Sequence, residues 1–307
     1  MKAVICKSYG PPSVLELNQI EKPTPKANEV LIKIHAATVT AGDIRLRAFN
    51  FPPLFWLPAR LIFGLFRPKK KILGHEFAGV VEAVGDKVSK FTIGDEVFGT
   101  TTLLSTGSYA EYFCIPETWK SGVMARKPKN LSFEASSALP VGSMTALYLL
   151  KKAKVDQSKK VLIYGASGSV GSYAIQLAHH LGKSVTGVCS TGNIEMVKSL
   201  GADEVIDYKY EDFTTRSPDF DIVFDAVGKT SKTAAKKILK GSGVFVSVNM
   251  MTSEKLEDLL GIKQMAETEK LKPFIDKIYS LDQIKEAHEY VDSGRKRGNV
   301  VVRVLNK

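Results

Sequence analysis

The sequence predicts an α/β protein of two parts, a compact β barrel followed by a doubly wound parallel sheet. Short strands separated by turn residues fill residues 1–120. From Lys160 onward, apolar strands alternate with amphipathic helices, which is the pattern of parallel βαβ units. A glycine-rich turn, Gly165–Gly171, joins the first of these strands to a helix. A chain of 307 residues is long enough for two such domains.

The strands of the first part are β-branched or aromatic runs between clusters of Pro, Gly and Asp. They are expected at Val30–His35, Ala78–Val84 and Tyr109–Ile115. Their even spacing is typical of a compact barrel.

The second part is predicted to hold buried strands with helices between them. The expected strands are residues 161–166, 184–190, 204–208 and 243–248, and the expected helices are Ala174–Leu181, Glu195–Leu200 and Ser231–Leu239. After Pro273 we expect a strand, a helix over Gln283–Asp292 and a last strand, NVVVRVL, that returns to the first part. The predicted domains are residues 1–124 and 125–265, with a returning segment at 266–307.

Composition narrows the class of protein. Apolar residues make up 44% and charged residues 24%, a balance that excludes a disordered or fibrous chain. The net charge of +11 permits anionic partners without naming one. The three cysteines, Cys6, Cys114 and Cys189, are too few for a disulfide framework or a four-cysteine zinc lobe. The start of the chain lacks a secretory pattern, so we expect a cytoplasmic protein.

The glycine-rich turn predicts a dinucleotide site. Glycines at such a turn let the backbone approach a pyrophosphate, and the amides of the helix N-terminus bind its charge. The spacing is G-x-x-G-x-x-G rather than G-x-G-x-x-G, and a purely structural turn is the alternative. The expected contacts are Gly165, Ala166, Ser167, Gly168, Ser169 and Val170.

The end of the second strand favours NADPH over NADH. An NAD site usually offers a carboxylate there, whereas this sequence has the neutral run Ser190–Asn193. We expect the 2′-phosphate against Ser190, Thr191 and Asn193, with Lys209 adding positive charge. The alternative is that this run only caps the next helix. Residues flanking the nicotinamide half are expected at the next two strand ends and in the tail, namely Asp225, Val227, Gly228, Ser247, Val248, Asn249 and Asn299.

The stretch Phe49–Phe66 is apolar but interrupted by three prolines and Arg60, whereas a membrane-spanning helix needs about 20 mostly apolar residues. It carries six aromatic residues: Phe49, Phe51, Phe55, Trp56, Phe63 and Phe66. We expect a lid that favours bulky apolar acceptors, with core packing as the alternative. The basic run Arg67–Lys71 next to it is compatible with peripheral contact to an anionic membrane.

Motifs along nearly the whole chain resemble the medium-chain dehydrogenase/reductase superfamily, and within it the zinc-independent quinone oxidoreductase-like branch. They include AATVTAGDIRLR, ILGHEFAGVVEAVG, FTIGDEVFG, ALPVGSMTALYLL, VLIYGASGSVGSYAIQLA, VFDAVG and GNVVVRV. The resemblance implies a GroES-like β-barrel catalytic domain, a Rossmann domain and an NADPH-dependent oxidoreductase. It also implies cofactor contacts from Thr145 and Tyr208.

The zinc-dependent relatives hold a catalytic metal, and the resemblance allows each ligand position to be compared. Thr40 stands where the first cysteine would be, His75 matches the histidine, and no cysteine lies near Gly142. A catalytic zinc needs three protein ligands, so no zinc is expected. The resemblance makes Thr40, Asp43 and His75 the candidate catalytic residues, with Thr40 as a donor to the acceptor oxygen and Asp43 holding the loop or a water.

Hydride transfer without a metal best suits a quinone or another small, apolar conjugated carbonyl, because the charge reaches an oxygen that needs only a hydrogen-bond donor. A 2-alkenal or enone double-bond reductase is one alternative, and a non-enzymatic NADPH-binding protein is another. No RNA-recognition module is evident, so no specific nucleic acid is expected.

The association of subunits is expected to be weak. The resemblance implies a further strand after residues 243–249 that pairs across a dimer axis. Here Met250–Lys272 is short and predicts one helix, with Leu256, Leu259, Leu260, Ile262 and Met265 at helical spacing. We therefore expect a sheet without an edge for a partner, and a monomer or weak homodimer.

Overall fold

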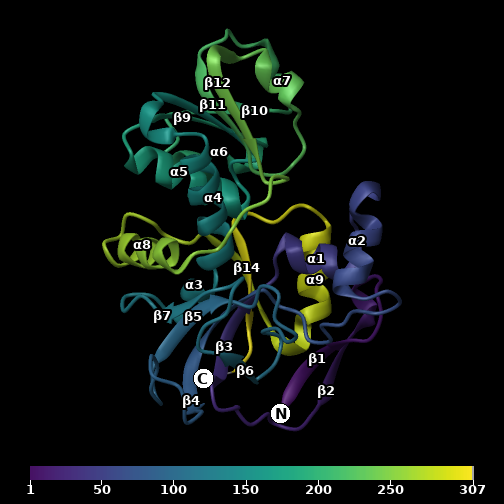
Figure 1. The fold of residues 1–307 in the computed structure, drawn as a ribbon. Helices are drawn as coiled ribbons and strands as arrows, with labels where there is room; N and C mark the ends of the chain where they lie inside the picture. Colours follow the sequence, from purple (N-terminus) through teal and green to yellow (C-terminus); the bar gives the residue numbers. More distant parts are fainter. Residues whose placement is uncertain (306–307) are drawn as a thin grey trace. The chain divides into compact units, whose positions relative to one another are not determined.

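The computed structural model describes residues 1–305, except for the side chains of residues 54 and 55. The chain forms two compact units (Figure 1). The first contains Met1–Val141, Lys255–Leu260 and Ile275–Lys307, and the second contains Gly142–Glu254 and Gly261–Phe274. The first unit extends beyond residue 124 because strand β7 (Met124–Arg126) pairs with β5 (Glu96–Thr100). The tail joins the first unit from Ile275.

Strand β3 (Glu29–Thr38) is the centre of the first unit, because three other strands pair with it. The main sheet has the order β13 (Ile275–Ser280), β14 (Asn299–Arg303), β3, β4 (Glu76–Val84), β5 and β7, and β6 (Tyr112–Pro116) also pairs with β3. A separate hairpin consists of β1 (Lys2–Cys6) and β2 (Leu15–Gln19). Val301 of β14 lies opposite Thr38 of β3, which places the tail in this sheet.

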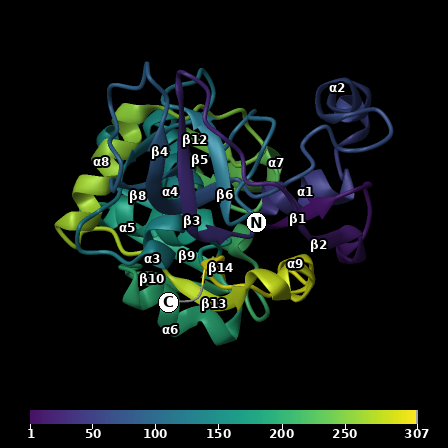
Figure 2. The same ribbon diagram turned by 90° about the horizontal axis from the view of Figure 1, so that it is seen from below.

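The helices of the first unit follow β3 and precede β14. They are α1 (Ala41–Ala48), α2 (Pro53–Phe63), the short α3 (Phe133–Ser137) and α9 (Ile284–Asp292). Helix α9 packs against α1 and β14 (Figures 1 and 2). The buried Arg47 of α1 joins the two helices, since its guanidinium contacts His288 Nδ1 at 3.2 Å and Asp292 at 2.7 Å.

The second unit is a five-stranded parallel sheet with helices packed against its strands. The strand order is β10 (Glu204–Asp207), β9 (Ser184–Cys189), β8 (Lys160–Tyr164), β11 (Phe220–Asp225) and β12 (Leu239–Ser247). Helix α5 (Ser169–His180) packs on β8 and β9, α6 (Ile194–Ser199) on β9 and β10, and α7 (Lys232–Lys236) on β12. Because all strands are parallel, their carboxyl ends share one edge, where such sheets bind ligands.

The outer strand of this sheet differs from one expectation drawn from the sequence. The described chain between β12 and β13 forms a single helix, α8 (Leu256–Glu267), as predicted. The inference that the sheet then lacks an edge for a partner is wrong, because β12 is itself the outer strand on that side. The weak association of subunits stays a prediction.

The three cysteines are free thiols. Cys6 and Cys189 are buried and Cys114 is half-buried. Burial raises the pKa of each thiol to about 11.

Candidate functional site

The glycine turn of the second unit has a backbone that only glycine can form. Gly165 has a φ of +78°, in the left-handed region, and a Cβ at Gly171 would lie 2.2 Å from the Gly165 carbonyl oxygen. The amides of Gly165 and Ala166 donate to the Val188 carbonyl of β9 at 3.1 and 3.0 Å, which anchors the turn. Gly168 occupies the N-cap of α5, so the positive end of a 12-residue helix faces this turn. The arrangement fits a dinucleotide pyrophosphate.

The turn after β9 is tied to the glycine turn by Asn193. Its amide donates to the hydroxyl of Ser167 at 3.1 Å and to the hydroxyl of Ser190 at 3.1 Å. Within the described structure, neither Ser190 nor Asn193 caps the helix that follows with its side chain. Both residues occupy N-cap positions, as the capping alternative expects, but their side chains bond to each other and to Ser167 beside the glycine turn.

Asp207 is a neighbour of this turn that sequence reasoning missed. It pairs with Cys189 across β10 and β9, and its hydrogen bond with the Thr191 side chain holds the pKa of the Asp207 carboxyl below its ordinary value. The sequence pattern indicated a role for Lys209 but none for Asp207, although Asp207 ends β10 and Lys209 follows it, at the edge that β10 shares with β9. Tyr208, the next residue, is 53% exposed there.

Asp225 organises the loops at the ends of β11 and β12. Its buried carboxylate accepts the amides of Val227 at 3.1 Å and Gly228 at 2.9 Å, together with the Ser247 hydroxyl at 3.1 Å. The Val248 amide donates to the Asp225 carbonyl at 3.0 Å, and the Asn249 side chain donates to the Gly228 carbonyl at 3.3 Å. The carboxylate of Asp225 therefore shapes the edge of the sheet through protein donors.

These loops meet the glycine turn. A Cβ at Gly165 would lie 2.5 Å from a Val227 methyl group, so the ends of β8 and β11 are in close contact. In helix α4 (Pro140–Lys152), a Cβ at Gly142 would lie 2.4 Å from the Ser169 hydroxyl, and the half-buried Thr145 follows on the same helix. Asn299 is placed at the start of β14 in the first unit, and its role toward a cofactor stays a prediction.

The first unit brings Thr40, Asp43 and His75 together. Thr40 is the N-cap of α1, and its hydroxyl accepts the Asp43 amide at 3.1 Å while donating to the Asp43 carboxylate at 2.6 Å. The other carboxylate oxygen accepts the Gly74 amide at 3.0 Å and contacts His75 Nδ1 at 2.7 Å. The capping box of α1 therefore positions the carboxylate that orients His75.

The charge of Asp43 determines which nitrogen of His75 carries the proton. Burial alone would raise the pKa of Asp43, but the His75 charge and the hydrogen bonds from His75 and Thr40 outweigh it, so this pKa lies well below its ordinary range. An ionised carboxylate only accepts hydrogen bonds, so Nδ1 of His75 is the donor. Nε2 is then left for another partner, and the His75 side chain is 24% exposed.

Glu76 is a second buried carboxylate that sequence reasoning did not assign. It accepts the Thr38 hydroxyl on one oxygen and the Val141 amide at 2.7 Å on the other. Burial outweighs these bonds and raises the pKa of Glu76 to about 7. Lys296, whose ammonium donates to the Gly298 carbonyl at 2.7 Å, lies near Glu76, and burial lowers its pKa to about 8. Both groups can change charge near neutral pH.

The polar layer behind Asp43 is structural. The Tyr109 hydroxyl donates to the Thr38 carbonyl at 3.0 Å, and burial raises the pKa of this phenol well above its ordinary value. Its ring meets the His288 ring edge-on at 5.6 Å. Burial lowers the pKa of His288 to about 4, which keeps this imidazole neutral beside Arg47.

The donor set does not fit a catalytic zinc. Among the residues that the structure describes, no three His, Cys, Asp or Glu side chains are arranged to hold a metal ion. Thr40, at the position that the resemblance gives to the first cysteine, donates a hydrogen bond to Asp43 instead.

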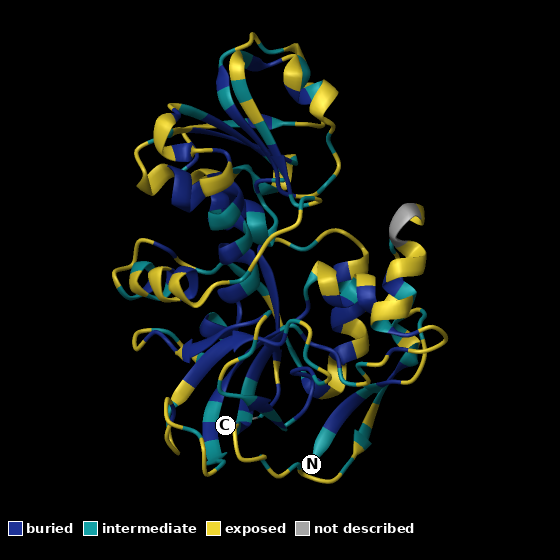
Figure 3. Ribbon diagram, viewed as in Figure 1, coloured by how far each residue is buried: buried dark blue, intermediate teal, exposed yellow. Residues whose placement is uncertain are grey.

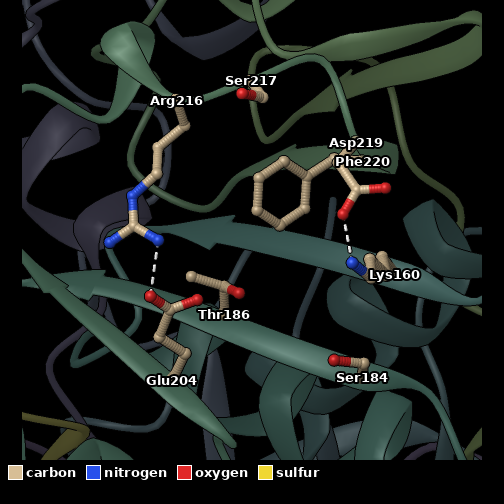
Figure 4. A pocket seen from close by; sticks show the side chains of 8 residues that line it. All are labelled: Lys160, Ser184, Thr186, Glu204, Arg216, Ser217, Asp219 and Phe220. Atoms are coloured by element: carbon tan, nitrogen blue, oxygen red, sulfur yellow. Dashed lines mark hydrogen bonds and ion pairs between the residues drawn. The ribbon is translucent and has the colours of Figure 1, made fainter.

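One cavity of about 290 Å³ lies in the second unit, at the amino ends of the strands (Figure 4). Lys160, Ser184, Glu204 and Phe220 are the first residues of β8, β9, β10 and β11. Its charges pair with one another, Arg216 with Glu204 and Lys160 with Asp219. It lies at the opposite edge of the sheet from the glycine turn, so we assign it a structural role.

Comparisons with known proteins match both units. Residues 26–127 match the alcohol dehydrogenase GroES-like domain, and residues 169–271 and 248–302 each match a zinc-binding dehydrogenase domain. The chain is 36% identical to a 2-methylene-furan-3-one reductase of Solanum lycopersicum over 98% of its own length and 79% of the relative's. It is 31% identical, with the same two coverages, to a chloroplastic NADPH-dependent alkenal/one oxidoreductase of Arabidopsis thaliana.

A solved structure is similar to the chain over nearly its whole length. The quinone oxidoreductase from Coxiella burnetii is 30% identical in sequence and superposes with a TM-score of 0.83, over 99% of each chain.

Proposed function

The chain belongs to the medium-chain dehydrogenase/reductase superfamily, as an NAD(P)H-dependent oxidoreductase of the quinone oxidoreductase and alkenal reductase type, and from this premise we propose that it reduces conjugated enals and enones with NADPH. The observation that carries the proposal is the Asp43–His75 pair, which leaves one imidazole nitrogen for a carbonyl oxygen. Two relatives that align with nearly the whole chain, the Solanum lycopersicum reductase and the Arabidopsis thaliana oxidoreductase described above, are named for reactions on compounds of this kind.

The bound nicotinamide would supply a hydride to the β-carbon of the acceptor. As the C–H bond forms there, the double bond shifts and negative charge reaches the carbonyl oxygen. The Nε2 atom of His75 can donate a hydrogen bond to that oxygen while Nδ1 donates to Asp43. The Asp43 carboxylate keeps its negative charge and so compensates the positive charge of a ring that carries both protons. The products are the saturated carbonyl and the oxidised cofactor, with one proton consumed.

Thr40 and Asp43 act as positioning residues in this proposal. The one proton of the Thr40 hydroxyl is donated in a hydrogen bond to the Asp43 carboxylate, so Thr40 orients the carboxylate rather than donating to the acceptor. This assignment replaces the expectation that Thr40 is the direct donor.

The preference for NADPH rests on the second unit. Ser167, Ser190 and Asn193 form one hydrogen-bonded group beside the glycine turn, with the exposed Tyr208 and Lys209 at the end of the adjacent strand. These neutral and cationic groups suit a 2′-phosphate. Asp207 is the opposing charge; its Oδ1 accepts the Lys209 amide at 3.0 Å, and Thr191 contributes to the lowered pKa of this carboxyl.

The test compares a 2-alkenal, an exocyclic enone, a quinone and a saturated aldehyde, each with NADPH and with NADH. We expect fast reduction of the first two with NADPH, and a saturated ketone or aldehyde as the product. His75→Gln should lower kcat by about 10²-fold while NADPH binding is unchanged. Turnover of the saturated aldehyde at a similar rate, or a strict requirement for added zinc, would contradict the proposal.

Quinone reduction is the second candidate, supported by the likeness to the Coxiella burnetii enzyme. A quinone accepts hydride into the same kind of conjugated system, so the same donor serves it. A higher kcat/KM for the quinone than for both enones would favour this candidate.

The segment Phe49–Phe66 stays a predicted lid. Its removal should raise the KM of bulky acceptors more than that of small ones, whereas equal changes would indicate a structural role.

A further inference from the structure

Helix α2 and the residues after it are largely exposed (Figure 3), and several of their exposed side chains are apolar. The exposed apolar side chains, here called the apolar stripe, are Leu57, Leu61, Ile62, Leu65 and Phe66, with exposed fractions from 49% to 86%. Leu57 and Leu61 are four residues apart and share one face of the helix. Figure 2 shows α2 at one margin of the first unit. Soluble proteins rarely leave such a patch uncovered without a partner.

The inner side of α2 already packs against other residues of the first unit. Ala59 is buried, and the Phe63 ring stacks on Phe51 at 5.5 Å. Arg60, the charged residue within α2, turns its guanidinium onto aromatic rings, 3.8 Å from the centroid of Phe49 and 4.8 Å from that of Trp56. Its Nη1 also donates to the Leu65 carbonyl at 2.9 Å. The charge thus faces inward, so the outer face is purely apolar. The side chain of Phe55 lies outside the described residues.

Charges of one sign border the apolar stripe. Arg67, Lys69 and Lys71 are exposed immediately after it, and Lys69 donates to the Leu61 carbonyl at 2.7 Å, which holds this segment against the helix end. The sequence between Asp43 and Glu76 contains no Asp or Glu. This segment therefore combines apolar side chains with cations and has no carboxylate. Such a surface complements an anionic membrane, where the apolar side chains contact hydrocarbon and the cations contact negative headgroups.

We propose that α2 and the following residues up to Lys71 dock this protein on an anionic lipid surface. Leu57, Leu61 and Ile62 of the stripe lie on α2, and Leu65 and Phe66 follow its end. A second copy of the chain would bring two basic segments together, and this repulsion opposes self-association through the stripe. No helix in the described part of the chain is long and apolar enough to cross a membrane, so the contact is peripheral.

The test is flotation of the full chain with vesicles of phosphatidylcholine alone and of equal parts phosphatidylcholine and phosphatidylglycerol. We expect binding to the anionic vesicles and about tenfold less to the neutral ones. The double variant Leu61→Glu with Phe66→Glu should lose binding by a similar factor, and the triple variant Arg67→Gln, Lys69→Gln, Lys71→Gln should lose its preference for anionic lipid. Ile93→Glu, at an apolar residue 68% exposed outside this segment, is the matched control.

A direct reporter is Trp56, which is 44% exposed. In a Trp119→Phe background its emission should shift to the blue on adding anionic vesicles, with no shift on adding neutral ones. Unchanged thermal unfolding and NADPH binding in each variant exclude misfolding as the cause. Equal flotation of the glutamate variant and the parent, or a dimer in buffer that this variant dissociates without any flotation, would overturn the proposal.

Discussion

The Asp43–His75 network of the first unit and the glycine turn of the second are both candidate functional regions, but they are built differently. The network joins the Asp43 side chain to His75, a distant position in the sequence, and to the nearby Thr40 by charge and hydrogen bonds. The turn is made of the backbone of seven consecutive residues. Removal of a charge or a change of pH should therefore alter the stability that the network provides. A larger side chain in place of a glycine should alter the binding of the cofactor at the turn.

Removal of the Asp43 charge should have the largest effect. Asp43→Asn leaves His75 and the Gly74 amide without their ionic acceptor in a buried site, and breaking such a buried pair costs about 3 kcal/mol or more. Urea unfolding measures the loss. Asp282→Asn, which breaks the exposed pair with Lys2, is the control and should change stability little. Similar losses of stability in both variants would show that the buried network stabilises the fold no more than an exposed ion pair does.

The pH dependence of the free energy of unfolding should distinguish the buried carboxylate of Glu76 from that of Asp43. The pKa of Glu76 is raised to about 7, so the folded state binds the extra proton and the contribution of this group to stability falls as pH rises from about 4.5 to 7. Glu76→Gln should remove this slope, on the order of 3 kcal/mol across the window. The depressed pKa of Asp43 has the opposite sign, and its contribution is lost only as pH falls below its ordinary value. Unfolding curves at several pH values that coincide for the variant and the parent would contradict this assignment.

An added carbon should disturb the turn without any change of charge. Gly171→Ala places a Cβ against the Gly165 carbonyl, so the backbone must shift, and NADPH affinity should fall about 10- to 100-fold. Calorimetric titration measures the affinity. Gly261→Ala is the matched control, because a Cβ there meets open space. An unchanged dissociation constant for Gly171→Ala would show that the turn does not hold the cofactor.

The choice between cofactors should be the smallest effect. Thr191→Asp adds a carboxylate beside Asp207 and should shift the NADPH to NADH preference about tenfold toward NADH, whereas Asp207→Asn should shift it the other way. The ratio of kcat/KM for the two cofactors measures both. Tighter binding of NADH by the unmodified protein would refute the predicted preference.

The same contrast explains what the sequence could predict. The strand, the glycine turn and helix α5 are encoded within one continuous stretch, residues 160–180, so their pattern is visible in the sequence. Glu76 is bonded to Thr38 and Val141, and Asp207 reaches Thr191 only because their strands are adjacent. Such pairings depend on the tertiary structure and leave no local pattern.

Helix α2 was also missing from the sequence prediction, for a local reason. Its prolines excluded a membrane-spanning helix and no shorter helix was predicted, yet Pro53 occupies the first turn, where no backbone donor is needed, and Pro58 is tolerated inside the helix. The ring contacts of Arg60 then hold the helix in place. Those contacts are tertiary, and the sequence pattern of this segment shows only its apolar character.

The free thiols have a consequence for the chemistry proposed here. Enals and enones alkylate cysteine thiolates, so an enzyme that handles them risks self-modification. With a pKa of about 11, only roughly one Cys6, Cys114 or Cys189 side chain in ten thousand is a thiolate at pH 7, and two of the three are also buried. The protein should therefore resist inactivation by the electrophiles that it is proposed to consume.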